Sequence, residues 1–265
     1  MRLAVLSDIH GNLTALEAAL ADLEVQGGAD VMWFLGDLAA FGPRPKESVQ
    51  RVKALVDAVK DDEAKKGTIR VIHGNTDRYL VYGLRPKFPA AKDAEEWDKL
   101  RADLRNFSDR VHWCQDQLGF EEYEFLHKLP GECNVEVEGY GSVIGYHGVP
   151  GDDESNALLN NTSDELAADA LLDREGRLGI GGHTHVQMDR MLSIGGWRAV
   201  NVGSVGVPFD EHIGKAQYGI FIFEAGEVQI DLRAIAYDVD AVIADSYARN
   251  NPASAWLENK LRGGS

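Results

Sequence analysis

The chain has 265 residues, 44% of them hydrophobic and 26% charged, which excludes a disordered or fibrous protein and allows a sizeable buried core. A formal net charge of −16, without any run of Lys and Arg, disfavours nucleic acid as a partner. The chain has only two cysteines, and we see neither a signal sequence nor an apolar stretch of roughly 20 residues. We therefore expect a cytoplasmic protein without a membrane span.

Three units of strand, loop and helix are expected in the first third of the chain. Short apolar runs at residues 3–6, 31–35 and 69–72 predict the strands, and each run ends in a polar loop. Apolar residues at helical spacing over 13–23 and 49–59 predict helices after the first two strands. Such units in series imply a partly parallel sheet, in which sites gather at the carboxyl ends of the strands.

Residues 78–129 differ in character from what precedes them. The segments 94–107 and 111–126 are charge-rich and dotted with aromatic residues, and they show helical periodicity without a strand signal. We interpret residues 78–129 as a helical insertion in a single domain that spans residues 1–265. The insertion is either a packed helical hairpin with solvated charged faces or a roof over a site.

The rest of the chain is strand-rich apart from one helix. Residues 163–172 predict that helix, with Ser163 as its N-cap and Glu165 in its first turn. Alternating or compact apolar segments predict the strands, at 134–138 and 143–146, which are bounded by glycine, and at 178–180, 188–194, 197–200, 218–223 and 228–235. We therefore expect an α/β fold whose two halves face each other as two sheets with helices outside.

Side chains able to bind metal follow the apolar runs, where strands give way to loops. They are Asp8, His10, Asp37, Asn75, His147, His183 and His185. Considered singly, an Asp or Asn at such a position is more often a turn or cap residue, and a lone His is more often structural. Together they weaken that interpretation, because Gly36, Gly74 and Gly182 also allow tight loops beside them.

Oxygen and imidazole ligands together suit Mn, Fe, Zn, Co or Ni rather than calcium, and a carboxylate such as Asp37 can bridge two cations. Two cations roughly 3.5–4 Å apart are a recurrent device for displacement at phosphorus. The residue types therefore predict a pair of divalent metal ions that act on a phosphate ester.

The order of the motifs resembles the signature of the calcineurin-like metallophosphoesterases, and within that superfamily the small bacterial phosphodiesterase branch. The motifs span residues 8–206 and are Asp8-Ile9-His10-Gly11-Asn12, Gly36-Asp37, Gly74-Asn75-Thr76-Asp77, His147, Gly182-His183-Thr184-His185 and Asn201-Val202-Gly203-Ser204-Val205-Gly206. No motif covers the helical insertion.

The resemblance implies a four-layer α/β/β/α sandwich of two mixed sheets. It also implies that Asp8, His10, Asp37 and His185 hold one cation, and that Asp37, Asn75, His147 and His183 hold the other, with Asp37 as the bridge. A hydroxide shared between the cations would then attack phosphorus, and Asn75 would also touch the substrate.

One position departs from the family pattern. Many members carry His in the third position of the Gly-Asn-x-Asp motif, where it helps the leaving group to depart, but this chain has Thr76, which cannot act as an acid. We expect esters with good leaving groups, or an acid from elsewhere. Asp77 is a candidate catalytic residue that orients a nearby group, or it is a turn residue.

Three further residues are candidate substrate contacts. Arg44 and Arg78 lie beside the Asp37 and Asn75 loops and could clamp a phosphate, or they are solvated surface residues. Ser204 could offer a donor near the cleft or form an ordinary turn. His73, His112, His127 and His212 have no motif support, and we expect them to be structural or exposed.

The sequence thus predicts a hydrolase that acts on a small phosphodiester or nucleotide. The alternatives are a protein phosphatase, a dinucleoside-polyphosphate hydrolase, or a non-catalytic scaffold such as the superfamily's retromer subunit. All seven positions matched to the family's ligands carry competent ligands, which favours catalysis. No feature of the sequence specifies an oligomeric state.

Overall fold

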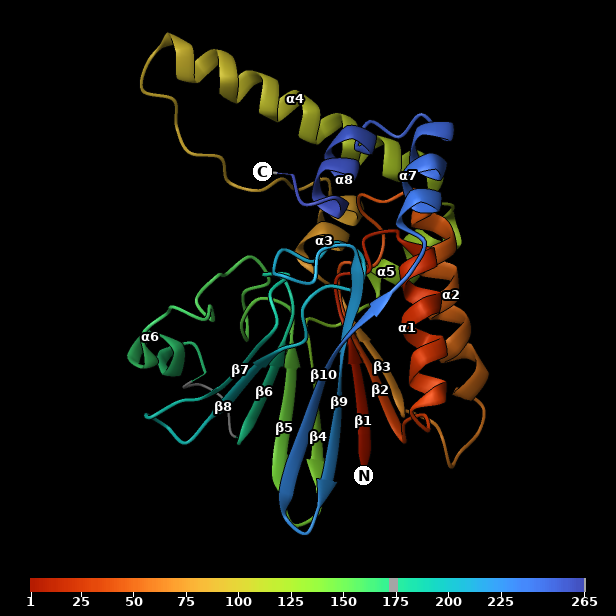
Figure 1. The fold of residues 1–265 in the computed structure, drawn as a ribbon, viewed down its shortest axis with the longest axis vertical. Helices are drawn as coiled ribbons and strands as arrows, with labels where there is room; N and C mark the ends of the chain where they lie inside the picture. The colour runs from red at the N-terminus through yellow and green to blue at the C-terminus, as the bar shows by residue number, and fades with distance from the viewer. Residues whose placement is uncertain (172–175, 265) are drawn as a thin grey trace.

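Two five-stranded sheets pack face to face in the computed structural model, which describes residues 1–171 and 176–264 (Figure 1). The first sheet has the order β10-β9-β1-β2-β3. Its parallel strands are β1 (Arg2–Leu6), β2 (Val31–Leu35) and β3 (Ile69–Ile72), and its antiparallel strands are β9 (Lys215–Glu224) and β10 (Glu227–Ala236).

The second sheet has the order β4-β5-β6-β8-β7, and it is mixed as well. Its strands are β4 (Glu132–Val137), β5 (Gly141–Tyr146), β6 (Leu178–Gly181), β7 (Met188–Met191) and β8 (Arg198–Asn201). β5, β6 and β8 are parallel, whereas β4 and β7 pair antiparallel at the two edges. The predicted fold class, two mixed sheets with helices, is confirmed.

The layers follow from which face each strand residue buries. In β1, Leu3 and Val5 pack against the second sheet, whereas Ala4 and Leu6 pack toward the helices α1 (Leu13–Val25) and α2 (Pro45–Val59). A strand buried on both faces reads as one continuous apolar run, which is why the sequence reveals it. On the outer face of the second sheet, α6 (Asp164–Asp169) packs its alanines onto Tyr146 and Trp197.

The helical region differs in detail from the prediction. α3 (Asn75–Tyr82) begins at the Gly-Asn motif itself, and α4 (Ala94–Gln117) runs unbroken through residues 108–110, where we expected a break between two helices. The break lies instead at Gly119, whose N–H donates to the Glu122 carboxylate 2.8 Å away at the start of α5 (Phe120–His127). Residues 108–110 contain no Gly or Pro that would end a helix, so α4 continues through them. The capping contact at Gly119 sets the start of α5 instead.

Other predicted boundaries shift by a few residues. Ser163 is the N-cap of α6 as predicted, with its Oγ accepting from the N–H of Leu166 at 3.4 Å, but the helix ends at Asp169. Leu172, the last residue of the predicted helix, lies outside the described residues. The strand predicted at 188–194 ends at Met191, where the chain turns toward β8.

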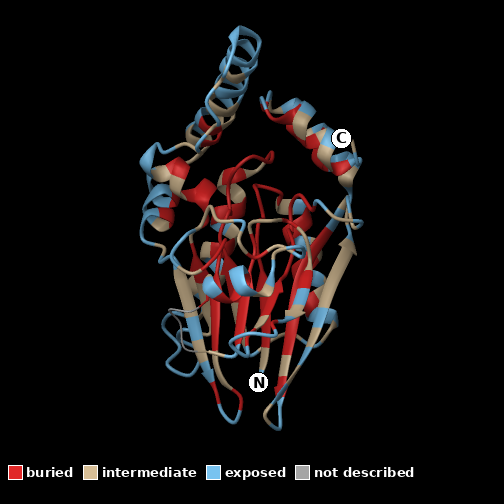
Figure 2. Ribbon diagram, turned by 90° about the vertical axis from the view of Figure 1, so that its left-hand side faces the viewer, coloured by how far each residue is buried: buried red, intermediate tan, exposed pale blue. Residues whose placement is uncertain are grey.

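Two helices at the C-terminus were not predicted. α7 (Val239–Ala248) and α8 (Ser254–Leu261) lie at the end of the molecule toward which β1 and β2 run (Figure 1). Figure 2 shows that the loops at this end are largely buried. Among residues 1–171 and 176–264, no helix has both the length and the apolar composition that a bilayer crossing needs.

The loops after β2 and β3 touch each other through glycine. Gly36 has φ +90°, and a Cβ there would lie 2.3 Å from the backbone nitrogen of Gly74. Gly182 is equally confined, because its Cβ would lie 1.9 Å from Ser7 Oγ. The expected tight loop geometry at Gly36 and Gly182 is present, and it sets the distances between the loops.

Replacement of Gly36 by alanine should separate these two loops. Because Gly36→Ala combines a strained positive φ with a backbone clash, it should lower the free energy of unfolding by about 3 kcal/mol or more in urea denaturation. Gly27→Ala is the matched control, since Gly27 has φ +96° but nothing within 4 Å of its Cβ position, and it should cost about 1–2 kcal/mol. Equal losses in the two variants would show that the close approach contributes nothing.

Candidate metal centre

The seven predicted metal-binding side chains meet at the carboxyl ends of five strands. Asp8 and His10 follow β1, Asp37 follows β2, and Asn75 follows β3. From the second sheet, His147 follows β5, and His183 and His185 follow β6. Because the strands within each sheet segment are parallel, their ends lie along one edge, and the two edges face each other.

Most of these residues adopt an unusual backbone conformation. Seven non-glycine residues have positive φ in the part of the chain that the structure describes, and five of them belong to this set. They are Asp8, His10, Asp37, His183 and His185, with φ between 51° and 66°. Left-handed conformations of non-glycine residues cost free energy and cluster at functional sites, where they aim side chains that a regular strand cannot aim.

One group of ligand atoms forms around Asp8 Oδ1. His185 Nε2 lies 3.2 Å from this oxygen and His10 Nε2 lies 3.6 Å from it, while the two imidazole nitrogens are 3.0 Å apart. All three side chains are buried. An oxygen and two nitrogens this close together, from segments far apart in sequence, could hold a metal ion.

A second group forms around His147. Its Nε2 lies 3.4 Å from Asp37 Oδ2 and 3.0 Å from Asn75 Oδ1, and the same amide oxygen lies 3.0 Å from His183 Nδ1. Asp37 Oδ2 is also 3.7 Å from His10 Nε2. Asp37 Oδ2 thus lies within 4 Å of a histidine from each group, and its role as a bridge stays a prediction.

Backbone carbonyls fix the orientation of three of the imidazole rings. Nδ1 of His10 contacts the carbonyl oxygen of Ala40, Nδ1 of His147 lies 2.7 Å from that of Leu35, and Nδ1 of His185 lies 2.5 Å from that of Val207. A carbonyl only accepts, so each Nδ1 donates, and Nε2 of the neutral ring is left with its lone pair facing the cluster. This is the arrangement of metal-binding histidines.

The buried carboxylates of the cluster need a compensating positive charge. Asp8 and Asp37 are both buried, and Asp8 Oδ1 has no hydrogen-bond partner among the described residues. Burial by itself would lower the pKa of His147, but the charges of Asp37 and Asp8 raise it to about 10. Divalent cations would supply this charge instead of protons, and the nitrogen and oxygen donors present fit such cations.

Asp77 and Thr76 serve the loops around Asp37. The carboxylate of Asp77 is fully buried and accepts from the N–H of Leu38 at 2.9 Å and of Gly74 at 3.1 Å. Burial and the nearby charge of Asp37 raise the pKa of Asp77 to about 6. The backbone N–H of Thr76 donates to Asp37 Oδ1 at 2.8 Å. As a catalytic residue Asp77 stays a prediction; its contacts connect the β2 loop to the β3 loop.

Arg44 and Ser204, two of the candidate substrate contacts, both have partners within the protein. Arg44 donates to Asp245 at 2.6 Å and to Glu47 at 3.2 Å, and its substrate contact stays a prediction. Ser204 is fully buried, and its hydroxyl donates to the carbonyl of Asp8 and accepts from the N–H of Val207, both at 2.8 Å. In this structure the Ser204 hydroxyl connects its own loop to the loop after β1, and a substrate contact of Ser204 stays a prediction.

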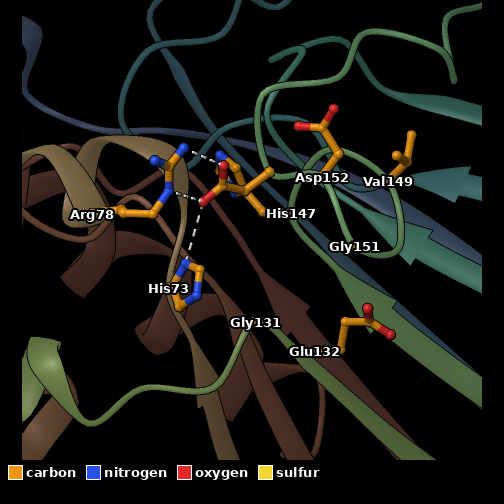
Figure 3. Close-up of a pocket in the computed structure, with 9 residues that line it drawn as sticks. His73, Arg78, Gly131, Glu132, His147, Val149, Gly151 and Asp152 are labelled. Atoms are coloured by element: carbon orange, nitrogen blue, oxygen red, sulfur yellow. Dashed lines mark hydrogen bonds and ion pairs between the residues drawn. The ribbon is translucent and has the colours of Figure 1, made fainter. Parts of the chain in front are cut away.

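Arg78 borders a cavity of about 370 Å³ beside His147 (Figure 3). Its Nε and Nη2 donate to the carboxylate of Asp153 at 2.8 and 2.7 Å, and Nη2 also reaches Glu154 at 2.7 Å. His73, to which the sequence assigned no role, lines the same cavity with Nδ1 3.3 Å from Asp153 Oδ2. The only sequence signal that His73 lies near the site is its position directly before Gly74 and Asn75.

Phe209 is a further residue that the sequence did not indicate. Its ring stacks on the imidazole of His185, with centroids 4.4 Å apart and planes at 21°, and 46% of the residue is exposed. From α8, Lys260 places its Nζ 5.6 Å from the centroid of the Phe209 ring. A single Phe in a loop carries no sequence signal, because its importance comes entirely from what it contacts.

Comparisons with known proteins agree with this geometry. Residues 1–225 match the calcineurin-like phosphoesterase superfamily domain. The crystal structure of a metallophosphoesterase from Sphaerobacter thermophilus is similar, with a TM-score of 0.70 and 25% identity, over 100% of this chain and 99% of that one. The uncharacterized protein MJ0912 of Methanocaldococcus jannaschii is 27% identical over 98% of this chain and 96% of its own length.

A shorter likeness is to the symmetrical bis(5'-nucleosyl)-tetraphosphatase of Klebsiella pneumoniae. The two chains are 35% identical over 77 residues, which are 29% of this chain and 24% of the tetraphosphatase. The chain thus matches only about a quarter of that enzyme's length, whereas it matches MJ0912 from end to end.

Removal of bound cations should destabilise the protein, because Asp8 and Asp37 would be left buried together. A chelator should lower the melting temperature by roughly 5–10 °C, the effect of a ligand that contributes about 3 kcal/mol, and Mn²⁺ should restore it. Asp8→Asn, which keeps the shape and removes one charge, should respond less to the chelator. A melting temperature that the chelator leaves unchanged in both proteins would contradict a bound cation.

Proposed function

The chain belongs to the calcineurin-like phosphoesterase superfamily, and on that premise we propose that it is a metal-dependent phosphodiesterase that acts on a small phosphodiester or nucleotide. The observation that carries the proposal is the unpartnered, buried Asp8 Oδ1, which has imidazole nitrogens of His185 and His10 at 3.2 and 3.6 Å. A carboxylate oxygen that is buried without a hydrogen bond destabilises a protein unless a positive charge compensates it, which favours a bound cation at this position.

We further propose two cation positions that share Asp37. Asp8, His10 and His185 would complete the first, and Asn75, His147 and His183 would complete the second. Support comes from Asp37 Oδ2, which lies 3.7 Å from His10 Nε2 in one group and 3.4 Å from His147 Nε2 in the other. The mixture of imidazole and oxygen donors suits Mn, Fe, Ni, Zn or Co. When bound, such cations lower the pKa of a water and stabilise charge on phosphoryl oxygens.

The protein's own residues would position the ester. The Oδ1 of Asn75 lies 3.0 Å from His147 and His183, and we propose that its amide nitrogen donates to a phosphoryl oxygen. Arg78 is held by Asp153 and Glu154 through Nε and Nη2, and its Nη1 donates to no partner among the described residues. We propose that Nη1 contacts the substrate from the cavity beside His147.

The cavity wall favours a diester over a polyphosphate. It carries the carboxylates of Asp152 and Asp153, and the guanidinium of Arg78 beside them is already paired with Asp153 and Glu154. Several negative groups near the cavity would repel the additional charges of a polyphosphate chain more than the single charge of a diester. The likeness to the tetraphosphatase keeps a dinucleoside polyphosphate as the second candidate substrate.

We also propose a cytoplasmic location. Cys114 and Cys133 are both free thiols in the structure, as expected of a protein kept in a reducing compartment. The chain's net charge of −16 is consistent with a small substrate rather than nucleic acid.

The activity can be tested with a panel of substrates and metals. The wild-type protein should hydrolyse a bis-aryl phosphodiester with Mn²⁺ or Ni²⁺ faster than an aryl monoester, a cyclic nucleotide or a dinucleoside polyphosphate. Asp37→Ala should lower kcat/KM by at least about 100-fold, because it removes the shared carboxylate. Arg51→Ala, which breaks only a surface ion pair with Glu17, is the control and should keep full activity. If no metal supports turnover of any ester, a non-catalytic scaffold becomes the better explanation.

The choice of leaving group tests the role of position 76. Thr76 has no acidic proton to give, so a diester with a phenolate leaving group should react much faster than one with an alkoxide leaving group. Rates measured for a matched series of phenyl and alkyl diesters should therefore fall steeply as the pKa of the leaving alcohol rises. Equal rates across the series would mean that another residue supplies the proton.

A further inference from the structure

The two C-terminal helices lie outside the family match, which ends at residue 225, yet they contact the loops of the metal centre. We propose that α7 and α8 are a positioning element for the first cation position. They hold the two backbone segments whose carbonyls orient His10 and His185. The inference rests on the proposed function, because it presumes that these two histidines bind a cation.

The first contact runs through the segment that orients His10. Nδ1 of His10 donates to the carbonyl of Ala40, and the next carbonyl along the chain, that of Phe41, accepts from Asn251 Nδ2 at 3.0 Å. Asn251 lies between α7 and α8 and is 4% exposed. Its amide therefore fixes the peptide next to the one that fixes His10.

Further contacts between the C-terminal helices and this loop support the same segment. The ring of Trp256, on α8, meets the ring of Phe41 edge-on, with centroids 6.3 Å apart. Asp245, on α7, accepts from Arg44 at 2.6 and 2.8 Å, just beyond the loop. The loop that orients His10 is thus held to the C-terminal helices by an amide, an aromatic contact and an ion pair.

The second contact runs through Val207, the residue that orients His185. The carbonyl of Val207 lies 2.5 Å from His185 Nδ1, and its fully buried side chain packs into an apolar cluster made by the C-terminal helices. The other buried members of this cluster are Val242, Ile243, Leu257 and Leu261. A shift of α7 or α8 would therefore move the acceptor that sets the His185 ring.

The second cation position is held differently. The carbonyl that orients His147 belongs to Leu35, the last residue of β2, inside the first sheet. Asn75 and His183 contact each other, and their loops are fixed by the close approaches of Gly36 to Gly74 and of Gly182 to Ser7. The C-terminal helices should therefore affect one position and spare the other.

A sharp test replaces only the donor of the Asn251 amide. Asn251→Asp keeps the oxygen that accepts from the N–H of Ala253 at 2.9 Å, but it removes the donor to Phe41 and sets an oxygen against that carbonyl. Ser254→Ala is the matched control, because Ser254 lies in the same buried polar cluster and its hydroxyl contacts Ser246 and Asn251 but not Phe41. Asn251→Ala, which removes the donor to Phe41 without setting a charge against its carbonyl, serves if Asn251→Asp does not fold.

The measurement is a calorimetric titration of the metal-free full chain with Mn²⁺, with thermal denaturation to verify folding. We expect two sites in the wild type, and in Asn251→Asp one unchanged site and one weakened by roughly 10–100-fold, the usual effect of losing a residue that orients a ligand. The weakened site should be the one missing from His10→Ala and kept in His147→Ala. Ser254→Ala should keep both sites.

The outcomes separate this inference from the function on which it rests. A wild-type protein that binds no Mn²⁺ would overturn the proposed function and the inference together. A wild type with two sites, and a folded Asn251 variant in which both are unchanged or both weaken equally, would overturn the positioning role alone. A structural role of Asn251 would lower the melting temperature without favouring one site.

Discussion

Two buried carboxylates that share one small volume are the constraint around which this molecule is arranged. Asp8 and Asp37 have almost no exposed surface, and the same imidazole, that of His147, lies within 3.8 Å of both. Two negative charges cannot stay buried at this separation without positive charge between them. The histidines around them, with their Nε2 atoms turned inward, make a cation the natural source of that charge.

The loops accept considerable strain to create this arrangement. Five of the seven clustered residues have left-handed backbone conformations, and two glycines allow contacts that no side chain would permit. Asp77 then connects two of the loops by accepting from the N–H groups of Leu38 and Gly74. The strands supply a stable base, but the positions of the ligand atoms depend on these loop-to-loop contacts, which the sandwich of two sheets brings within reach.

The sequence revealed the parts of this structure whose signals are local. β1, β2 and β3 are buried on both faces and read as apolar runs, so the residues directly after them could be located. The contacts of Ser204 could not be predicted in the same way, because its hydroxyl donates to the carbonyl of Asp8, 196 residues away in the chain. α7 and α8 were missed because they are short, at 10 and 8 residues, and each buries only two apolar residues beside a serine, Ser246 or Ser254. Asn251, between the two helices, has its partner Phe41 210 residues away, which no local signal could indicate.

The part of the chain that matches the family supplies the donor atoms of the site, whereas the C-terminal helices contact the segments that orient two of the histidines. All seven clustered side chains lie within residues 1–225, so the donor atoms come from the part of this chain that matches the family. Donor atoms alone do not set affinity, because an imidazole whose Nδ1 partner can move loses part of its orientation. In this chain the Nδ1 partner of His147 belongs to a central strand, whereas those of His10 and His185 lie in loops that contact helices beyond the family match. On the proposed positioning role, a region that contributes no ligand would tune the affinity of one cation position, so the metal affinity of this chain would depend on residues beyond the family match as well as on the ligands.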